Sequence, residues 1–128
     1  MSITLLAVDD DASSAELIVR IAERCGFEAF ATSDPRGFIE LCNQLRPLVL
    51  SIDVNMPNID ARGLLKLLSE AKFAGKIMIV SGQDTDTLQH VADFGENLGL
   101  QRPAIMQKPI DISQMRLLLG GFIAKLKV

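Results

Sequence analysis

Short runs of apolar residues alternate along the chain with segments in which apolar residues recur at helical spacing. Apolar runs of four to six residues are typical of strands that are covered on both faces of a sheet. The runs predict five such strands, at Ile3–Val8, Phe27–Thr32, Leu48–Ile52, Ile77–Val80 and Ala104–Gln107. The pattern therefore predicts a core built on buried strands.

The segments that follow these strands predict five helices, each with apolar residues every three or four positions. The first helix follows Asp9–Asp11 and stops at Gly26. The second is expected to start at Asp34–Pro35, where an N-cap residue precedes a first-turn proline. The third is expected to close near Gly75, and the last to start near Asp111. Strand and helix thus alternate five times.

Strands that alternate with helices imply right-handed crossovers and a parallel sheet with helices on both faces. In open sheets of this kind, sites form at the carboxyl ends of the strands. The polar residues at predicted strand ends are Asp9, Asp10, Asp53, Ser81 and Lys108. We therefore expect these side chains to meet at one edge of the sheet.

Three carboxylates at one edge repel each other, and the repulsion raises the pKa of at least one of them. A divalent cation removes this conflict, and oxygen ligands suit Mg²⁺. Lys108 adds a second positive charge, Ser81 a hydroxyl donor, and Gly82 space and a free backbone N–H. Together these groups match the oxygens of a phosphoryl group in transfer. Asp53, on the middle strand, is the expected nucleophile.

The composition fits one globular domain over residues 1–128. Of the 128 residues, 48% are hydrophobic and 23% charged, which excludes disorder. The net charge is −3 and the basic residues form no block, so direct nucleic-acid binding is not expected. No apolar stretch approaches the roughly 18 residues of a membrane span, so no membrane contact is expected.

Cys25 and Cys42 are too few for a disulfide framework and fall at apolar helical positions, so we expect small buried thiols. The start of the chain, Met1–Thr4, has neither a charged region nor a cleavage site typical of a signal peptide. A reducing, cytoplasmic location is therefore expected. His90, the only histidine, is expected to be an exposed surface residue.

Four motifs, in this order, resemble the receiver domain of bacterial two-component response regulators. They are Val8–Asp11, Ser51–Asp60, Ile79–Gly82 and Lys108–Pro109. The resemblance extends from about Ile3 to the C-terminus and so covers nearly the whole chain. It implies a flavodoxin-like (βα)₅ fold, with a doubly wound, parallel, five-stranded sheet of strand order 2-1-3-4-5.

The same resemblance implies how the expected site works. It implies that a histidine kinase or phosphotransfer protein phosphorylates Asp53 and that Mg²⁺ is required. Asp10 and Asp53 resemble direct metal ligands, and Asp9 a more peripheral one that acts through water. Asn55 resembles a ligand that contributes its backbone carbonyl.

The resemblance implies that the Ser81 hydroxyl, with Gly82 beside it, turns toward the phosphoryl group. It implies that Lys108 forms an ion pair with that group. The implied function is a phosphoacceptor switch in a phosphorelay rather than an enzyme with turnover. The phosphate shifts a surface that a downstream protein or a fused output domain recognises. A homodimer is compatible with this function.

The chain departs from the family pattern at three places. Ile105 stands where the family usually has Tyr or Phe, so the usual aromatic switch is absent. Ala61 replaces the glycine that usually follows the Asp60 position. The stretch from Ser81 to Lys108 is longer than usual, with the extra length around residues 97–103, so the fourth helix and the next loop are expected to deviate.

Two other functions stay open at this point. A pseudo-receiver would keep the acidic residues as an interaction module without useful phosphorylation, and Ile105 favours it. A Mg²⁺-dependent phosphohydrolase of the haloacid dehalogenase type also uses a nucleophilic aspartate, but at the end of its first strand. Structural roles compete as well: Asp11 suits a turn or a first helical turn, and Asn55 and Asp60 suit loop shaping.

Overall fold

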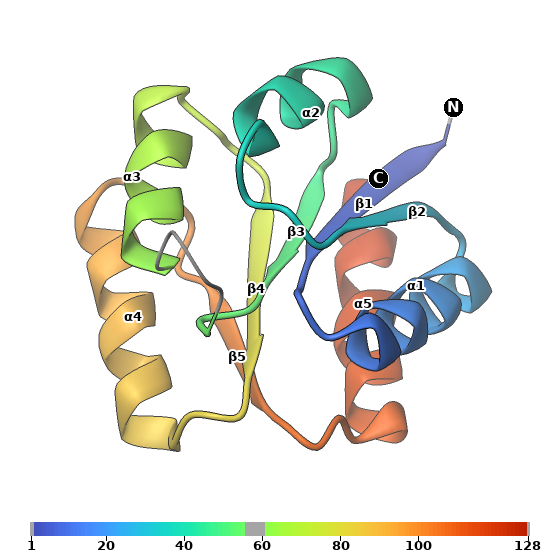
Figure 1. Cartoon of the computed structure of the whole chain (residues 1–128). Coiled ribbons are helices and arrows are strands. Elements are labelled where there is room, and N and C mark those ends of the chain that lie inside the picture. The colour runs from blue at the N-terminus through green and yellow to red at the C-terminus, as the bar shows by residue number, and fades with distance from the viewer. Residues whose placement is uncertain (1, 56–60, 128) are drawn as a thin grey trace.

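The chain folds into a parallel sheet with helices on both faces (Figure 1). The computed structural model describes residues 2–55 and 61–127. The strands are β1 (Ile3–Val8), β2 (Phe27–Thr32), β3 (Val49–Ile52), β4 (Lys76–Ser81) and β5 (Ala104–Gln107). The helices are α1 (Ala12–Cys25), α2 (Phe38–Leu45), α3 (Ala61–Glu70), α4 (Thr85–Asn97) and α5 (Ile112–Leu126). The strand order is β2-β1-β3-β4-β5, which confirms the expected flavodoxin-like topology.

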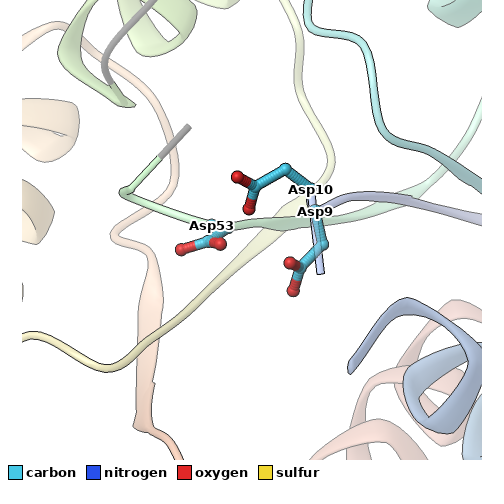
Figure 2. Close-up of side chains that lie close together, drawn as sticks. All are labelled: Asp9, Asp10 and Asp53. Atoms are coloured by element: carbon cyan, nitrogen blue, oxygen red, sulfur yellow. The ribbon is translucent and has the colours of Figure 1, made fainter. Parts of the chain in front are cut away.

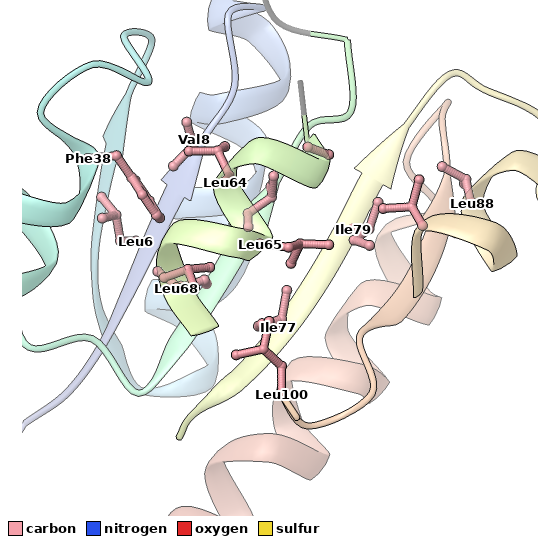
Figure 3. Close-up of a cluster of buried hydrophobic side chains, with 14 residues drawn as sticks. Leu6, Val8, Phe38, Leu64, Leu65, Leu68, Ile77, Ile79, Leu88 and Leu100 are labelled. Atoms are coloured by element: carbon pink, nitrogen blue, oxygen red, sulfur yellow. The ribbon is translucent and has the colours of Figure 1, made fainter. Parts of the chain in front are cut away.

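Two hydrophobic cores lie on opposite faces of the sheet, because successive side chains of a strand point to opposite faces. Leu6 and Val8 of β1 belong to the core beneath α2, α3 and α4 (Figure 3). Leu5 and Ala7 belong to the other core, beneath α1 and α5. The residues of β3 are buried throughout. Burial on both faces explains why the strands are continuous apolar runs in the sequence.

The predicted start of the second helix at Asp34 is wrong, because α2 begins at Phe38. The Asp34 carboxylate instead accepts hydrogen bonds from the backbone N–H and the guanidinium of Arg36. This local contact takes the oxygens that an N-cap would offer to the helix. Gly37, at φ 73°, stands before the helix and provides no side-chain cap. The helix is fixed by its first residue, Phe38, which is buried in the core.

The third helix also ends before the predicted stop near Gly75, since α3 ends at Glu70. Lys72 takes the left-handed conformation, at φ 59°, and the Phe73 N–H donates to the Leu68 carbonyl. Such bonds satisfy carbonyls at a helix end. Gly75 has a different role: a Cβ there would lie 2.5 Å from the Leu48 carbonyl oxygen.

We expect Gly75→Ala to destabilise the fold by about 1–3 kcal/mol, the usual cost of overpacking. The added methyl would press on backbone, which cannot rotate away as a side chain can. Gly120→Ala is the matched control, since a Cβ at Gly120 meets nothing within 4 Å. Alanine there should add up to about 1 kcal/mol to helix stability. Chemical denaturation of both variants measures the difference, and equal stabilities would contradict the predicted clash.

The connection from α4 to β5, residues 98–103, is held by side-chain contacts with two helices. The Ser69 hydroxyl donates to the Leu98 carbonyl oxygen over 2.8 Å. Arg102 forms salt bridges with Asp93 and Glu96 on the outer side of α4. These contacts tie the connection down on both α3 and α4. Within the described residues, none of the helices is long and apolar enough to cross a membrane.

Candidate functional site

The strand ends meet at one edge of the sheet because the strands pair in register. Val8 of β1 is opposite Ile52 of β3, so the residues that follow, Asp9 and Asp53, leave the sheet side by side. The Asp53 N–H donates to the Val8 carbonyl over 3.0 Å and extends this pairing. On the other side, the Lys108 N–H donates over 2.7 Å to the carbonyl at the end of β4.

The structure brings together the three aspartates that the sequence placed at strand ends. One carboxylate oxygen from each of Asp9, Asp10 and Asp53 lies within 4.8 Å of the others. Figure 2 shows Asp9 and Asp10 just after β1 and Asp53 just after β3. Asp9 and Asp53 are only 2% and 4% exposed, whereas Asp10 is exposed to solvent. The cluster therefore has a buried floor and an open side.

The Asp9 carboxylate lies at the bottom of this cluster. Its Oδ1 accepts a hydrogen bond from the Asp11 N–H over 2.9 Å. Its Oδ2 lies 3.1 Å from the Lys108 ammonium, yet accepts no aligned hydrogen bond from any described residue. Burial, with the nearby charge of Asp53, raises the pKa of Asp9 above its ordinary value. One buried oxygen is thus left poorly satisfied.

Lys108 supplies positive charge to both buried carboxylates. Its Nζ lies 3.1 Å from Asp9 Oδ2 and 3.5 Å from Asp53 Oδ2, and its side chain is 18% exposed. Partial burial lowers the pKa of Lys108, but these two carboxylates outweigh it and the net pKa is raised. One ammonium among three carboxylates leaves the cluster with excess negative charge. Such an excess favours binding of a further cation.

A hydrogen-bonded link beside Asp53 was missed by the sequence analysis. The Gln83 side-chain N–H donates to Asn55 Oδ1 over 2.7 Å, and the Asn55 N–H donates to Asp53 Oδ1 over 3.0 Å. The link joins the loop after β3 to the loop after β4. Gln83 lies two residues after Ser81, so its position beside the site was the only signal in the sequence.

Ser81 is fully buried at the end of β4, and its hydroxyl oxygen accepts a hydrogen bond from the Gln83 N–H over 3.3 Å. Gly82 is exposed, and a Cβ there would meet no described atom within 4 Å. The space expected at Gly82 is therefore present. A larger residue would also fit there, so packing does not require glycine at this position. Ile105 of β5 packs, partly buried, against the core beneath α3 and α4.

Asp11 caps α1: its carboxylate accepts hydrogen bonds from the Ser13 N–H and the Ser14 hydroxyl. These bonds lower the pKa of Asp11, the Ser14 bond most strongly. Asp11 thus has the structural role that its place before a helix suggested. Residues 56–60, which include the motif position Asp60, lie outside the described residues.

The cluster fits a divalent cation that prefers oxygen. Mg²⁺ is usually held by one or two carboxylates together with water and phosphate oxygens. Asp10 and Asp53 are close enough for this, and the poorly satisfied Oδ2 of Asp9 lies beside them. The open side at Asp10 leaves room for water and for a phosphoryl group.

A shallow pocket of about 430 Å³ adjoins the cluster at Lys108. It lies between the start of α1 and the loop after β5, and its lining includes Leu17, Pro109 and Ile110. A larger cavity of about 650 Å³, which Leu48 and Lys76 help to line, lies at the opposite edge of the sheet. The smaller pocket therefore reaches the cluster through Lys108, and a further cavity of about 510 Å³ between α1 and β2 reaches it through Asp9.

The sequence matches the response regulator receiver domain family over residues 5–119. It is 27% identical, over 85% of its length, to the alkaline phosphatase synthesis transcriptional regulatory protein PhoP of Bacillus subtilis, of which it covers 43%. It is 29% identical, over 98% of its length, to protein-glutamate methylesterase/protein-glutamine glutaminase 5 of Myxococcus xanthus, of which it covers 36%. The chain thus spans less than half of each of these relatives.

Solved structures share the fold. The chemotaxis protein CheY4 of Vibrio cholerae superposes with a TM-score of 0.80 at 19% identity, over 95% of this chain and 99% of that one. The receiver domain of the Francisella response regulator 1452 superposes with a TM-score of 0.79 at 23% identity, over 98% and 99% of the two chains. Both likenesses support the topology of the sheet.

Proposed function

Because the chain belongs to the response regulator receiver domain family, we propose that it accepts a phosphoryl group on Asp53 in a Mg²⁺-dependent reaction. The phosphodonor is a histidine kinase or a histidine-containing phosphotransfer protein. The observation that carries this proposal is the position of Asp53, which is buried beside Lys108 and within 4.8 Å of Asp9 and Asp10. Asp9 shares the burial and the contact with Lys108, but Asp53 follows β3, the middle strand, so that the ends of β1 with Asp9 and Asp10 and of β4 with Ser81 lie on its two sides.

In the proposed reaction an Asp53 carboxylate oxygen attacks the phosphorus of a phosphohistidine. A new P–O bond forms, the P–N bond breaks, and the electron pair leaves with the imidazole nitrogen, which takes up a proton. Lys108 neutralises charge on the phosphoryl oxygens, and the Ser81 hydroxyl donates a hydrogen bond to one of them. Bound Mg²⁺ supplies further neutralisation of that charge.

Asp10 and Asp53 are the proposed direct ligands of Mg²⁺. Asp9 has a more peripheral role through water, and Asn55 contributes its backbone carbonyl. The distribution of charge in the cluster supports this set. Lys108 neutralises part of the negative charge of Asp9 and Asp53, whereas the exposed Asp10 carboxylate has no contact with Lys108. A cation held by Asp10 and Asp53 would share only Asp53 with Lys108, which also contacts Asp9.

The pocket beside Lys108 is the proposed docking place for the donor. Leu17 and Ile110 offer apolar contacts there, and Ser13 and Ser14 offer polar ones. Phosphorylation is proposed to change the surface that a downstream protein or a linked output domain recognises, in the cytoplasm. Ile105, which packs against the core where the family usually has an aromatic residue, is proposed to take part in this change by repacking.

The proposal is tested with Mg²⁺ and beryllium fluoride, which together imitate an aspartyl phosphate. We expect a rise in Tm of several degrees that needs both components, because a ligand that binds only the folded state stabilises it. Asp53→Asn should remove the rise. If neither protein responds, the chain is a pseudo-receiver and the proposal fails. Steady hydrolysis of small phosphomonoesters by the wild type would instead favour a phosphohydrolase.

We expect Asp10→Ala to weaken Mg²⁺ binding by about tenfold or more, because a metal ligand and its charge are lost. The stability without Mg²⁺ should stay equal or rise, because carboxylate repulsion is relieved while no core contact changes. Calorimetric Mg²⁺ titration and thermal melts measure the two effects. Glu28→Ala, an exposed acid on β2, is the control for net charge. A clear loss of stability in Asp10→Ala would contradict the prediction.

A further inference from the structure

The cavity of about 650 Å³ lies at the edge of the sheet opposite the aspartate cluster. Its walls are the end of α2, the segment before β3, the turn between α3 and β4, and the end of α5. In Figure 1 this edge lies at the top, where α2 leads into β3 and α3 into β4. The volume is within the range of cavities that hold small molecules.

The inner surface of this cavity is mostly apolar. Ile39, Phe73 and Leu126 line it, together with Leu48, which is 41% exposed although it is a large hydrophobic residue. Cys42 lines it as well, and burial raises the pKa of its thiol to about 11, so the thiol is uncharged at neutral pH. A group that covers these side chains removes apolar surface from water, which is favourable.

The polar part of the cavity is positively charged. Arg46, Lys72 and Lys76 line it, and no acidic side chain is among its described lining residues. None of the three forms a salt bridge with a carboxylate of the described chain. The Lys76 N–H donates to the Leu48 carbonyl over 2.9 Å, which holds the segment after α2 against the one after α3. The cavity thus presents three unpaired cations to one ligand.

The backbone gives a second indication of a role for these cations. Among the described residues other than glycine, only Arg46 and Lys72 have a positive φ, of 50° and 59°. This conformation is unfavourable for residues with a Cβ, and helix ends usually place Gly or Asn there. The helix dipole favours a cation after a helix, but it does not explain Lys76, which begins β4. Strained residues of this kind gather at ligand sites.

We infer that this cavity binds a small anionic amphiphile, an apolar chain that ends in a carboxylate. The chain covers Leu48 and Phe73, and the carboxylate lies among the cations. A nucleotide suits the cavity less well, because a nucleobase needs polar partners and the Gln101 amide already donates to the Ala74 carbonyl. The inference does not rest on phosphorylation of Asp53, which lies at the other edge of the sheet.

Octanoate is the probe, titrated into the ¹⁵N-labelled protein and followed by NMR. The expected Kd is about 0.1–1 mM for a ligand of this size. Amide shifts should be confined to residues 39–48, 71–76 and 101 and to the end of α5. Acetate lacks the chain and 1-octanol lacks the charge, so each should bind at least about fivefold more weakly. Octylammonium, which carries the opposite charge, should not bind.

Arg46→Asn combined with Lys72→Asn should raise the octanoate Kd about fivefold or more, because an exposed ion pair contributes a factor of about 1.5–5. The Tm should stay equal or rise, because asparagine tolerates a positive φ better than arginine or lysine does. Lys66→Gln combined with Arg116→Gln removes the same charges outside the cavity and should leave the Kd unchanged. A lost site is thereby separated from a damaged fold and from lost net charge.

Ala71 gives a test at a single exposed position in the lining. Ala71→Glu should raise the octanoate Kd at least about fivefold above that of Ala71→Gln, because the two side chains differ in charge and scarcely in size. Equal affinities of these two variants would show that the charge of the cavity does not select the ligand and would overturn the inference.

The two cysteines locate the ligand. Octanoate should slow the reaction of Cys42 with N-ethylmaleimide and leave Cys25, which packs against the core beneath α1 and α5, unaffected. Asp53→Asn should bind octanoate with the wild-type Kd, so this test is independent of the phosphoacceptor. Absence of octanoate binding up to about 10 mM, 1-octanol binding as tight as that of octanoate, or equal protection of both cysteines overturns the inference.

Discussion

Replacing Asp53 by asparagine is expected to lower phosphoryl acceptance by at least about a thousandfold, since an enzyme that loses its nucleophile loses this much or more. An amide oxygen carries no negative charge and does not form the acyl phosphate. The amide has the shape of the carboxyl group, so it still accepts the Asn55 N–H and the fold is kept. Intact-mass spectrometry after treatment with acetyl phosphate and Mg²⁺ measures the incorporated phosphoryl group.

Asp84→Asn is the matched control, because Asp84 is an exposed helix cap and asparagine serves equally well as a cap. This variant should accept phosphate at the wild-type rate. The assignment of Asp53 is contradicted if Asp53→Asn gains the phosphoryl mass as fast as Asp84→Asn does. Phosphoryl incorporation at Asp9 or Asp10 instead would show that the acceptor lies at the end of β1.

Replacing Lys108 by methionine is expected to reduce the stability of the Mg²⁺-free protein by about 1–3 kcal/mol. Removing one partner of a fully buried ion pair costs about 3–5 kcal/mol, because the other charge is left uncompensated. The expected loss of stability is smaller here, because the Lys108 side chain is 18% exposed and solvent partly screens the charges. Asp9 and Asp53 would then face each other without the ammonium.

Mg²⁺ should restore part of the stability that Lys108→Met loses, because a cation replaces the missing charge. Denaturant unfolding with and without Mg²⁺ measures both effects. Lys66→Met, on the exposed side of α3, is the control and should change stability by no more than about 0.5 kcal/mol. If Lys108→Met and Lys66→Met have the same stability without Mg²⁺, the Lys108 ion pairs contribute nothing to the fold.

The sheet could be predicted from the sequence because its strands are buried on both faces. Predicted and observed bounds agree for Ile3–Val8, Phe27–Thr32 and Ala104–Gln107. The convergence of Asp9, Asp10 and Asp53 followed from the same pattern, since the carboxyl ends of parallel strands lie at one edge.

The rest depends on contacts that a sequence pattern does not contain. The start of α2 was missed because Asp34 binds Arg36 locally instead of capping a helix. The link from Gln83 to Asn55 joins two loops whose approach is set by the packing of the sheet. Side-chain direction is a further case: Asp9 is buried against Lys108, while its neighbour Asp10 is exposed.

The most direct measurement is the identity of the modified residue. The wild-type chain is incubated with acetyl phosphate and Mg²⁺, the acyl phosphate is reduced with borohydride, and the peptides are mapped by mass spectrometry. Convergence of the carboxylates around Asp53 predicts one modified residue, Asp53, and no modification when EDTA removes Mg²⁺. Modification of a different carboxylate, modification that persists in EDTA, or no modification at all would contradict it.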